Sequence, residues 1–175
     1  MKNSILRLTL TLFLITAVVA AALAGINAIT APKIAALNAQ KTTDAIAAVL
    51  PNADNAEKVY TAPNADDAVQ AVYCANGAFA VNVITSGFGG DIVMMVGVDS
   101  DGKVLGVDII SHTETAGLGD VAAAQNAKGN AFRQQFVGQS GVLAVTKDGG
   151  AIEAITSATS AALSARPMIS RALIP

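Results

Sequence analysis

The chain has 175 residues, of which 53% are hydrophobic and only 4% aromatic, and its formal net charge is −2. This length suits one domain of ordinary size plus one appendage. No basic block is present, and phosphate binding needs clustered lysine and arginine, so the composition argues against nucleic acid as a partner. The high apolar content with so few aromatic side chains indicates that part of the chain faces lipid.

Cysteine and histidine are too scarce for most metal chemistry. The single cysteine, Cys74, excludes an intramolecular disulfide and a cysteine-built zinc or iron–sulfur site within this chain. With one histidine as well, a metal site would have to be all-carboxylate, and the spacing of Asp and Glu suggests none. We interpret Cys74, which follows Tyr73 at a predicted strand end, as a small core residue.

The first 32 residues contain a long uncharged run. It extends over residues 8–32, with Lys2 and Arg7 before it and Lys33 after it. About 20 apolar residues span a bilayer as a helix. Ala22-Leu23-Ala24 also fits the cleavage site of a signal peptide, but the apolar core of such a peptide is usually about 7–15 residues long. Since the run continues well past that site, we predict a retained transmembrane anchor over residues 1–32, whose orientation the flanking charges leave open.

The remainder predicts a helical connector and a small mixed domain. Residues 33–52 favour a helix that can continue the anchor and that Pro51 stops. Residues 52–68 look like a loop. Two short strands are expected around 69–74 and 78–85, separated by the tight-turn dipeptide Asn76-Gly77.

Two further apolar runs follow, joined by Asp99-Ser100-Asp101-Gly102, and form the clearest hairpin of the sequence. Residues 120–137 favour a helix, whose buried face can draw on Val121, Ala124, Phe132 and Phe136. Residues 141–145 suggest a short strand, and the pattern is helical again from Ser157. The predicted fold is therefore α+β: a single N-terminal transmembrane helix, then a small antiparallel-sheet domain with packed helices over residues 53–175.

The segment Ser-His-Thr-Glu-Thr-Ala-Gly-Leu-Gly-Asp, residues 111–120, lies between a predicted strand and a predicted helix. Gly117 and Gly119 would let the backbone approach a ligand closely. Their amides, with the helix start, can receive an anion or the polar edge of a ring. Glu114 and Thr115 add an acceptor and a hydroxyl. A glycine-rich surface connection has the same composition, and such connections are common.

His112, in the same segment, is the only histidine. It can hydrogen-bond to a ligand ring or act as an acid, although a lone histidine is more often a structural hydrogen-bonding residue. Nothing pairs it with a nucleophile, so we assign no catalytic residue and no hydrolytic activity.

The C-terminal segment concentrates hydroxyl groups at Thr156, Ser157, Thr159 and Ser160. At the start of a helix, unpaired amides and the positive end of the helix dipole suit a capping hydroxyl. The same place suits a phosphate, including one esterified to that hydroxyl. On this segment alone both interpretations stand, with capping the more common arrangement.

Taken together, the two segments resemble the covalent FMN-binding domain found in the G subunit of the Rnf complex and the C subunit of the sodium-translocating NADH:quinone reductase. The family motif Asp-x-x-Ser/Thr-Gly-Ala-Thr carries FMN on its last threonine, and residues 153–159, Glu-Ala-Ile-Thr-Ser-Ala-Thr, are similar to it. Residues 112–119 resemble the family pattern His-x-Glu-Thr-Pro-Gly-Leu-Gly. Residues 87–91, Gly-Phe-Gly-Gly-Asp, and residues 132–136, Phe-Arg-Gln-Gln-Phe, also resemble family stretches.

The resemblance implies that Thr159 carries FMN through a phosphoester bond. It implies further cofactor contacts from both segments: Thr156, Ser157, Ala158, His112, Glu114, Thr115, Gly117, Leu118 and Gly119. Three positions depart from the family pattern, with Glu153 for Asp, Ser157 for Gly and Ala116 for Pro. Ser157 matters most for attachment by a flavin transferase.

The short chain and its single anchor are more similar to the Rnf subunit than to its quinone-reductase counterpart. This resemblance implies an electron-carrying subunit of an ion-translocating ferredoxin:NAD⁺ oxidoreductase, a translocase in which other membrane and peripheral subunits are partners. It also implies that the FMN domain lies on the outer face of the cytoplasmic membrane. The chain has no Rossmann fingerprint, so NAD⁺ is expected to bind another subunit. A non-redox, membrane-tethered binding or assembly module and a stand-alone surface flavoprotein remain the alternatives.

Overall fold

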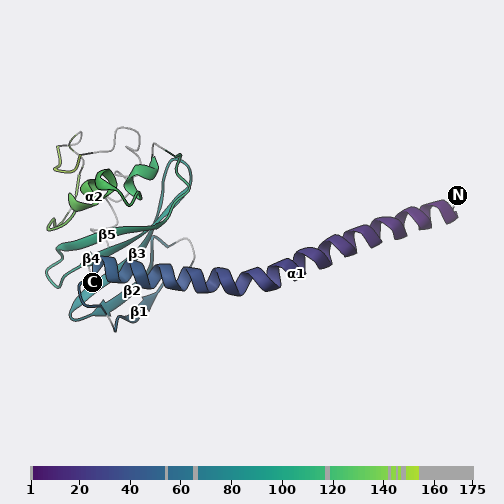
Figure 1. Cartoon of the computed structure of the whole chain (residues 1–175), viewed down its shortest axis with the longest axis horizontal. Helices are drawn as coiled ribbons and strands as arrows, with labels where there is room; N and C mark the ends of the chain where they lie inside the picture. The colour runs from purple at the N-terminus through teal and green to yellow at the C-terminus, as the bar shows by residue number, and fades with distance from the viewer. Residues whose placement is uncertain are drawn as a thin grey trace. The chain divides into compact units, whose positions relative to one another are not determined.

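In a computed structural model of the chain, a long N-terminal helix precedes a five-stranded sheet (Figure 1). The structure describes residues 2–53, 55–64, 67–116, 119–141, 143–144, 146 and 149–153. Its elements in chain order are α1 (Lys2–Val49), β1 (Glu57–Thr61), β2 (Val69–Ala75), β3 (Ala78–Ser86), β4 (Asp91–Val98), β5 (Val104–Ser111), the 3₁₀-helix η1 (Gly119–Ala122) and α2 (Ala127–Gln134). The α+β fold predicted from the sequence is confirmed.

Helix α1 runs without a break through Pro32, so the predicted connector continues the anchor. Contacts divide the chain between Lys41 and Thr42 into two units, and the last turns of α1 belong to the second. In the first unit the large apolar side chains are exposed. The hydroxyls of Thr9, Thr11, Thr16 and Thr30 donate to carbonyl oxygens of the preceding turn, at 2.8–3.0 Å. Such internal pairing is what a hydroxyl needs in lipid, and the helix is long and apolar enough to cross a membrane.

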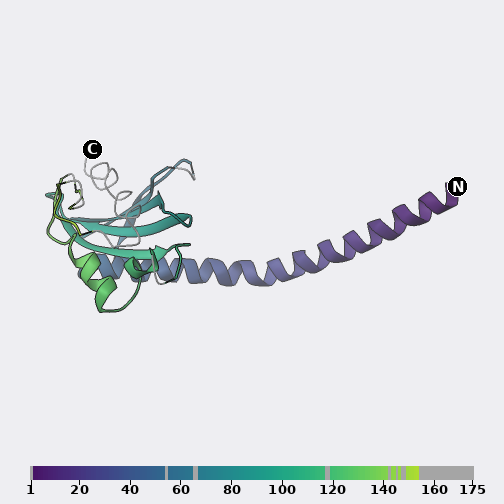
Figure 2. The same ribbon diagram turned by 90° about the horizontal axis from the view of Figure 1, so that it is seen from above.

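The five strands form an antiparallel meander in the order β1-β2-β3-β4-β5 (Figures 1 and 2). Because successive side chains of a strand point to opposite faces, the sheet has two cores. On one face, Met95 packs with Ala45, Ile46 and Val49 at the end of α1 and with Leu50 just after it. On the other face, Met94 belongs to a cluster that includes Val96, Phe136, Leu143 and Ile152.

The end of α1 packs directly on the backbone of the sheet. Gly97 of β4 and Gly106 of β5 are register partners, and Val49 lies over both. A Cβ atom at Gly97 would overlap the carbonyl group of Val49, and one at Gly106 would lie 3.1 Å from Val49 Cα. This pair of glycines therefore lets the helix end approach the sheet more closely than larger residues would allow.

Both predicted hairpins are confirmed, with Asn76-Gly77 between β2 and β3 and the Asp99–Gly102 turn between β4 and β5. Asp99 Oδ1 accepts from the amides of Asp101 and Lys103, which stabilises the second turn. The loop expected over residues 52–68 was wrong in part, because residues 57–61 form the edge strand β1. All side chains of β1 are exposed, so the strand lacks the alternation of apolar and polar residues that marks a half-buried strand.

The helix expected over 120–137 is two shorter elements, η1 and α2. Asn126 separates them, because its side chain accepts from the amides of Lys128 and Gly129 and so caps α2. Of the face expected to be buried, Phe136 is buried, whereas Val121, Ala124 and Phe132 are only partly so. Residues 141, 143 and 144 are not in the expected strand. The helix expected from Ser157 lies outside the described residues.

Candidate functional site

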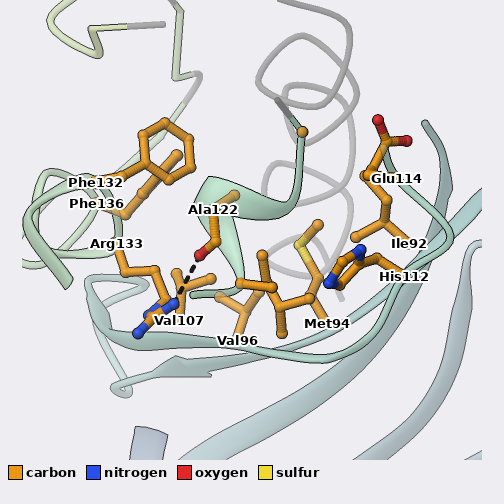
Figure 3. A pocket seen from close by; sticks show the side chains of 13 residues that line it. Ile92, Met94, Val96, Val107, His112, Glu114, Ala122, Phe132, Arg133 and Phe136 are labelled. Atoms are coloured by element: carbon orange, nitrogen blue, oxygen red, sulfur yellow. Dashed lines mark hydrogen bonds between the residues drawn. The ribbon is translucent and has the colours of Figure 1, made fainter. Parts of the chain in front are cut away.

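A pocket lies on the face of the sheet opposite the end of α1, between β4, β5, η1 and α2 (Figure 3). The space between its walls that no atom fills is about 570 Å³, a figure that includes open solvent. Its walls are mostly apolar: Ile92, Met94, Val96, Val107, Ile109, Ala122, Ala123, Phe132 and Phe136. Gly119 and three side chains with charged or polar ends, His112, Glu114 and Arg133, complete the lining. An apolar pocket with a few polar groups is typical of sites for planar organic ligands and cofactors.

One wall of the pocket comes from two aromatic side chains on α2 and just after it. Phe132 and Phe136 lie one turn apart, and their rings meet edge to face with centroids 5.3 Å apart. This geometry is a favourable one for aromatic pairs. Phe136 is 6% exposed and belongs to the core, whereas Phe132 is only partly buried. The Phe132 ring therefore remains available to a molecule in the pocket.

The opposite end of the pocket is lined by the segment that follows β5, and this segment docks through glycines on the loop between β3 and β4. Glu114 accepts a hydrogen bond from the amide of Gly89 at 3.0 Å, and the Thr113 hydroxyl donates to the Gly89 carbonyl at 3.1 Å. A Cβ at Gly87 would overlap the Glu114 carboxylate, and one at Gly119 would lie 2.8 Å from Glu114 Cβ. The Glu114 carboxylate thus occupies space that only glycines leave free.

His112 lies at this end of the pocket. Its side chain lies near Met94 and Ile92 in Figure 3. Nδ1 is buried and has no hydrogen-bond partner among the described residues. Leaving a buried polar atom unpaired costs about 1–3 kcal/mol, so such an atom in a pocket wall marks a place where a ligand can pair with it.

Arg133 is a buried cation in the pocket wall, only 8% exposed. Its guanidinium donates to the Ala122 carbonyl and the Asn130 side-chain oxygen, both at 2.6 Å, and more weakly to Ala124 and Gln125. Residues 132–136 resembled a family stretch, but the sequence alone assigned no role to Arg133. Its position between two aromatic residues, at the start of the Phe-x-x-x-Phe spacing, was the available signal.

The structure brings together some of the predicted site residues. His112, Glu114 and Gly119 line the same pocket. Thr115 is exposed and is not among the lining residues. Gly117, Leu118 and the whole C-terminal set, Thr156, Ser157, Ala158 and Thr159, lie outside the described residues. Within the described ranges, no group of three or more His, Cys, Asp or Glu side chains could hold a metal ion.

Two family models match the chain. Residues 87–173 match the FMN-binding domain, and residues 1–49 match the RnfG N-terminal region. The first match includes every pocket residue and the C-terminal hydroxyl cluster. The fold and the matched domain thus define a class of protein in which a membrane-anchored chain carries an FMN-binding domain.

Relatives extend this match over most of the chain. The G subunit of the Na⁺-translocating ferredoxin:NAD⁺ oxidoreductase complex of Acetobacterium woodii is 33% identical over 89% of this chain and 83% of its own length. The G subunit of the proton-translocating ferredoxin:NAD⁺ oxidoreductase complex of Clostridium ljungdahlii is 32% identical over 90% and 84%. The G subunit of the ion-translocating oxidoreductase complex of Stutzerimonas stutzeri is 34% identical over 63% and 53%. The chain belongs to the family of Rnf complex G subunits.

Proposed function

We propose that the chain carries electrons within an ion-translocating ferredoxin:NAD⁺ oxidoreductase complex, using FMN whose ring system lies in the described pocket. One observation supports the site above the others. His112 Nδ1 is a buried polar atom without a hydrogen-bond partner among the described residues, it belongs to a mostly apolar pocket, and that pocket lies within the matched FMN-binding domain. A flavin ring is planar and largely apolar with hydrogen-bonding atoms along one edge, so the lining residues fit it.

Within this proposal each part of the pocket has a distinct task. The β4 and β5 side chains and Phe132 contact the faces of the ring and exclude water from it. His112 hydrogen-bonds to its polar edge. Glu114 holds the loop of residues 112–116 against Gly89 and so fixes the position of His112. FMN supplies the chemistry, because it accepts electrons in pairs and releases them singly.

We further propose that FMN is covalently linked by a phosphoester to Thr159. The position of Glu153 supports this proposal, because it leaves Thr159 within reach of the pocket. The amide of Glu153 donates to the Gln135 side chain at 2.7 Å, and Gln135 immediately precedes Phe136 in the pocket wall. Thr159 follows Glu153 by six residues, which span at most about 20 Å when extended. The phosphate would lie among Thr156, Ser157 and Ala158, near a predicted helix start.

The anchor and the covalent link suit a domain on the outer face of the membrane. A phosphoester would retain the flavin where no cytoplasmic pool can replace it. This arrangement requires a flavin transferase for maturation and other subunits of the complex as electron donor and acceptor. It does not require the chain to bind NAD⁺ or to conduct ions.

A fluorescent-gel experiment tests the linkage. The full chain is coexpressed with a flavin transferase, separated on a denaturing gel and viewed under ultraviolet light. We expect a fluorescent band for the wild type and for Thr156→Ala, the matched control within the same hydroxyl cluster, and none for Thr159→Ala. Fluorescence that persists in Thr159→Ala would refute attachment at this residue. A dark wild-type band beside an active transferase would refute the covalent flavin and favour the non-redox assembly module.

A further inference from the structure

Arg133 is a buried positive charge whose partners are all neutral. Nη1 donates to the carbonyl oxygens of Ala122, at 2.6 Å, and Ala124, at 3.3 Å. Nη2 donates to the side-chain oxygens of Asn130, at 2.6 Å, and Gln125, at 3.4 Å. Within the described part of the chain no aspartate or glutamate pairs with this guanidinium. These hydrogen bonds engage Nη1 and Nη2, but none of their acceptors among the described residues carries a charge.

Such a charge is unusual, because buried ions in proteins are normally paired with an ion of opposite sign. A guanidinium tolerates burial better than an ammonium, since its charge is delocalised and weakly hydrated. Arg133 therefore stays charged, and it does so in the wall of a pocket that is otherwise mostly apolar. Apolar walls screen a charge poorly, so its attraction for a negative charge inside the pocket is stronger than it would be at the surface.

The two ends of the pocket carry side chains of opposite charge. In Figure 3, Arg133 lies on the side of the pocket away from Glu114 and His112. The Glu114 carboxylate is engaged with the Gly89 amide in the neighbouring loop. The positive charge is thus available to the contents of the pocket, whereas the negative charge is partly neutralised by the Gly89 amide of the neighbouring loop.

We propose that Arg133 stabilises the reduced, negatively charged state of the bound flavin ring and so raises its reduction potential. This inference rests on the proposed function. In the test below, the oxidised flavin ring takes two electrons from a reduced reference dye and one proton from the solvent. The dye is thereby oxidised, and the ring gains one negative charge. A fixed positive charge in the pocket wall favours that product over the neutral oxidised ring. The reduced ring would then supply the countercharge that the described residues do not supply to Arg133.

Arg133 also joins η1 to α2, so the test must separate charge from architecture. Asn130→Asp does so, because it keeps the oxygen that accepts from Nη2 but gives Arg133 an anionic partner. Arg133→Gln removes the charge, and Arg133→Lys keeps it. Gln134→Glu is the matched control, since it adds the same negative charge to an exposed position of α2.

The measurement is the equilibrium between the flavin of the full-length, flavinylated protein in detergent and a reference dye during slow reduction with dithionite. We expect Asn130→Asp and Arg133→Gln each to shift the equilibrium about tenfold toward oxidised flavin. Arg133→Lys and Gln134→Glu should remain near the wild-type value, the latter because water and salt screen exposed charges.

A wild-type equilibrium in Asn130→Asp would overturn the inference, whether or not Arg133→Gln folds. An equal shift in Gln134→Glu would also overturn it, because general surface charge would then explain the effect. The proposed function fails separately, by a denaturing gel on which none of these proteins, wild type included, carries flavin.

Discussion

The carboxylate of Glu114 accepts a hydrogen bond from the backbone amide of Gly89 at 3.0 Å, across 25 residues of sequence. This contact joins the loop between β3 and β4 to the loop that follows β5. It is possible only because Gly87 and Gly119 leave room for the carboxylate. The two loops therefore act as one support for the polar end of the pocket.

Replacing Gly119 with alanine should disturb this support. The new Cβ would lie 2.8 Å from Glu114 Cβ, so one of the two segments must move. We expect a loss of about 1–3 kcal/mol in the free energy of unfolding, as for other overpacked sites. Thermal unfolding of the full chain in detergent measures the change. Gly138→Ala is not a suitable control, because Gly138 has a φ of +80°.

Gly25→Ala is the better control for this substitution. Gly25 has no atom within 4 Å of the added Cβ and lies inside α1, where alanine is the better helix former. Equal melting temperatures for Gly119→Ala and the wild type would contradict the close packing of the loops around Glu114.

Gly97→Ala should destabilise the other face of the sheet. The added Cβ would overlap the carbonyl of Val49, which would force the end of α1 away from β4. We again expect a loss of about 1–3 kcal/mol, detected by denaturant unfolding. Val49→Ala, which leaves the same backbone contact but removes buried methyl groups, should cost a comparable amount for a different reason.

The two substitutions can be told apart by combining them. Truncating Val49 does not remove its backbone carbonyl, so the double variant should lose roughly the sum of both single losses, apart from the coupling expected between neighbours. A full rescue of Gly97→Ala by Val49→Ala would show that the clash involves the side chain and not the backbone.

Replacing His112 with leucine should change the stability of the flavin-free protein and the solvent access of the flavin in the flavinylated protein. In the flavin-free chain it removes a buried nitrogen that has no partner among the described residues, so stability should stay level or rise by about 1 kcal/mol. In the flavinylated chain a hydrogen bond to the ring should be lost, and iodide should quench the flavin fluorescence more strongly. A large loss of stability without flavin would mean that His112 is a structural residue.

The membrane anchor predicts that the mature protein keeps its N-terminus. Intact mass spectrometry of the protein extracted from membranes should match the full chain of 17.6 kDa plus the proposed covalent flavin. Cleavage after Ala24 would remove 24 residues and release the protein from the membrane on alkaline extraction. That result would replace the anchor with a signal peptide.

A charge placed within the anchor gives an independent test. Val18 is exposed in the middle of the uncharged run, and arginine near the centre of a membrane helix costs about 2.5–3.5 kcal/mol on insertion scales. Val18→Arg should therefore lower the membrane-integrated fraction, whereas Val18→Leu should not. Equal integration of both variants would argue against a spanning helix at this position.

Local patterns were enough to predict much of this molecule. The uncharged run over residues 8–32 predicts a membrane helix because length and polarity are properties of the local sequence. Asn76-Gly77 and Asp99–Gly102 specify their hairpins because turn geometry depends on a few neighbouring residues. The motif over residues 112–119 was also recognisable from neighbouring residues, and three of them line one end of the pocket. The family resemblance of this motif pointed to FMN.

Only the tertiary structure decided the remaining features, because they depend on residues that are distant in sequence. Strand β1 exists through its pairing with β2, although none of its side chains is buried. Gly97 and Gly106 matter because the end of α1 lies on them, and Gly89 matters because Glu114 reaches it. No sequence pattern gave Arg133 a role, and the packing of α2 against η1 and the sheet made it a buried cation in the pocket wall.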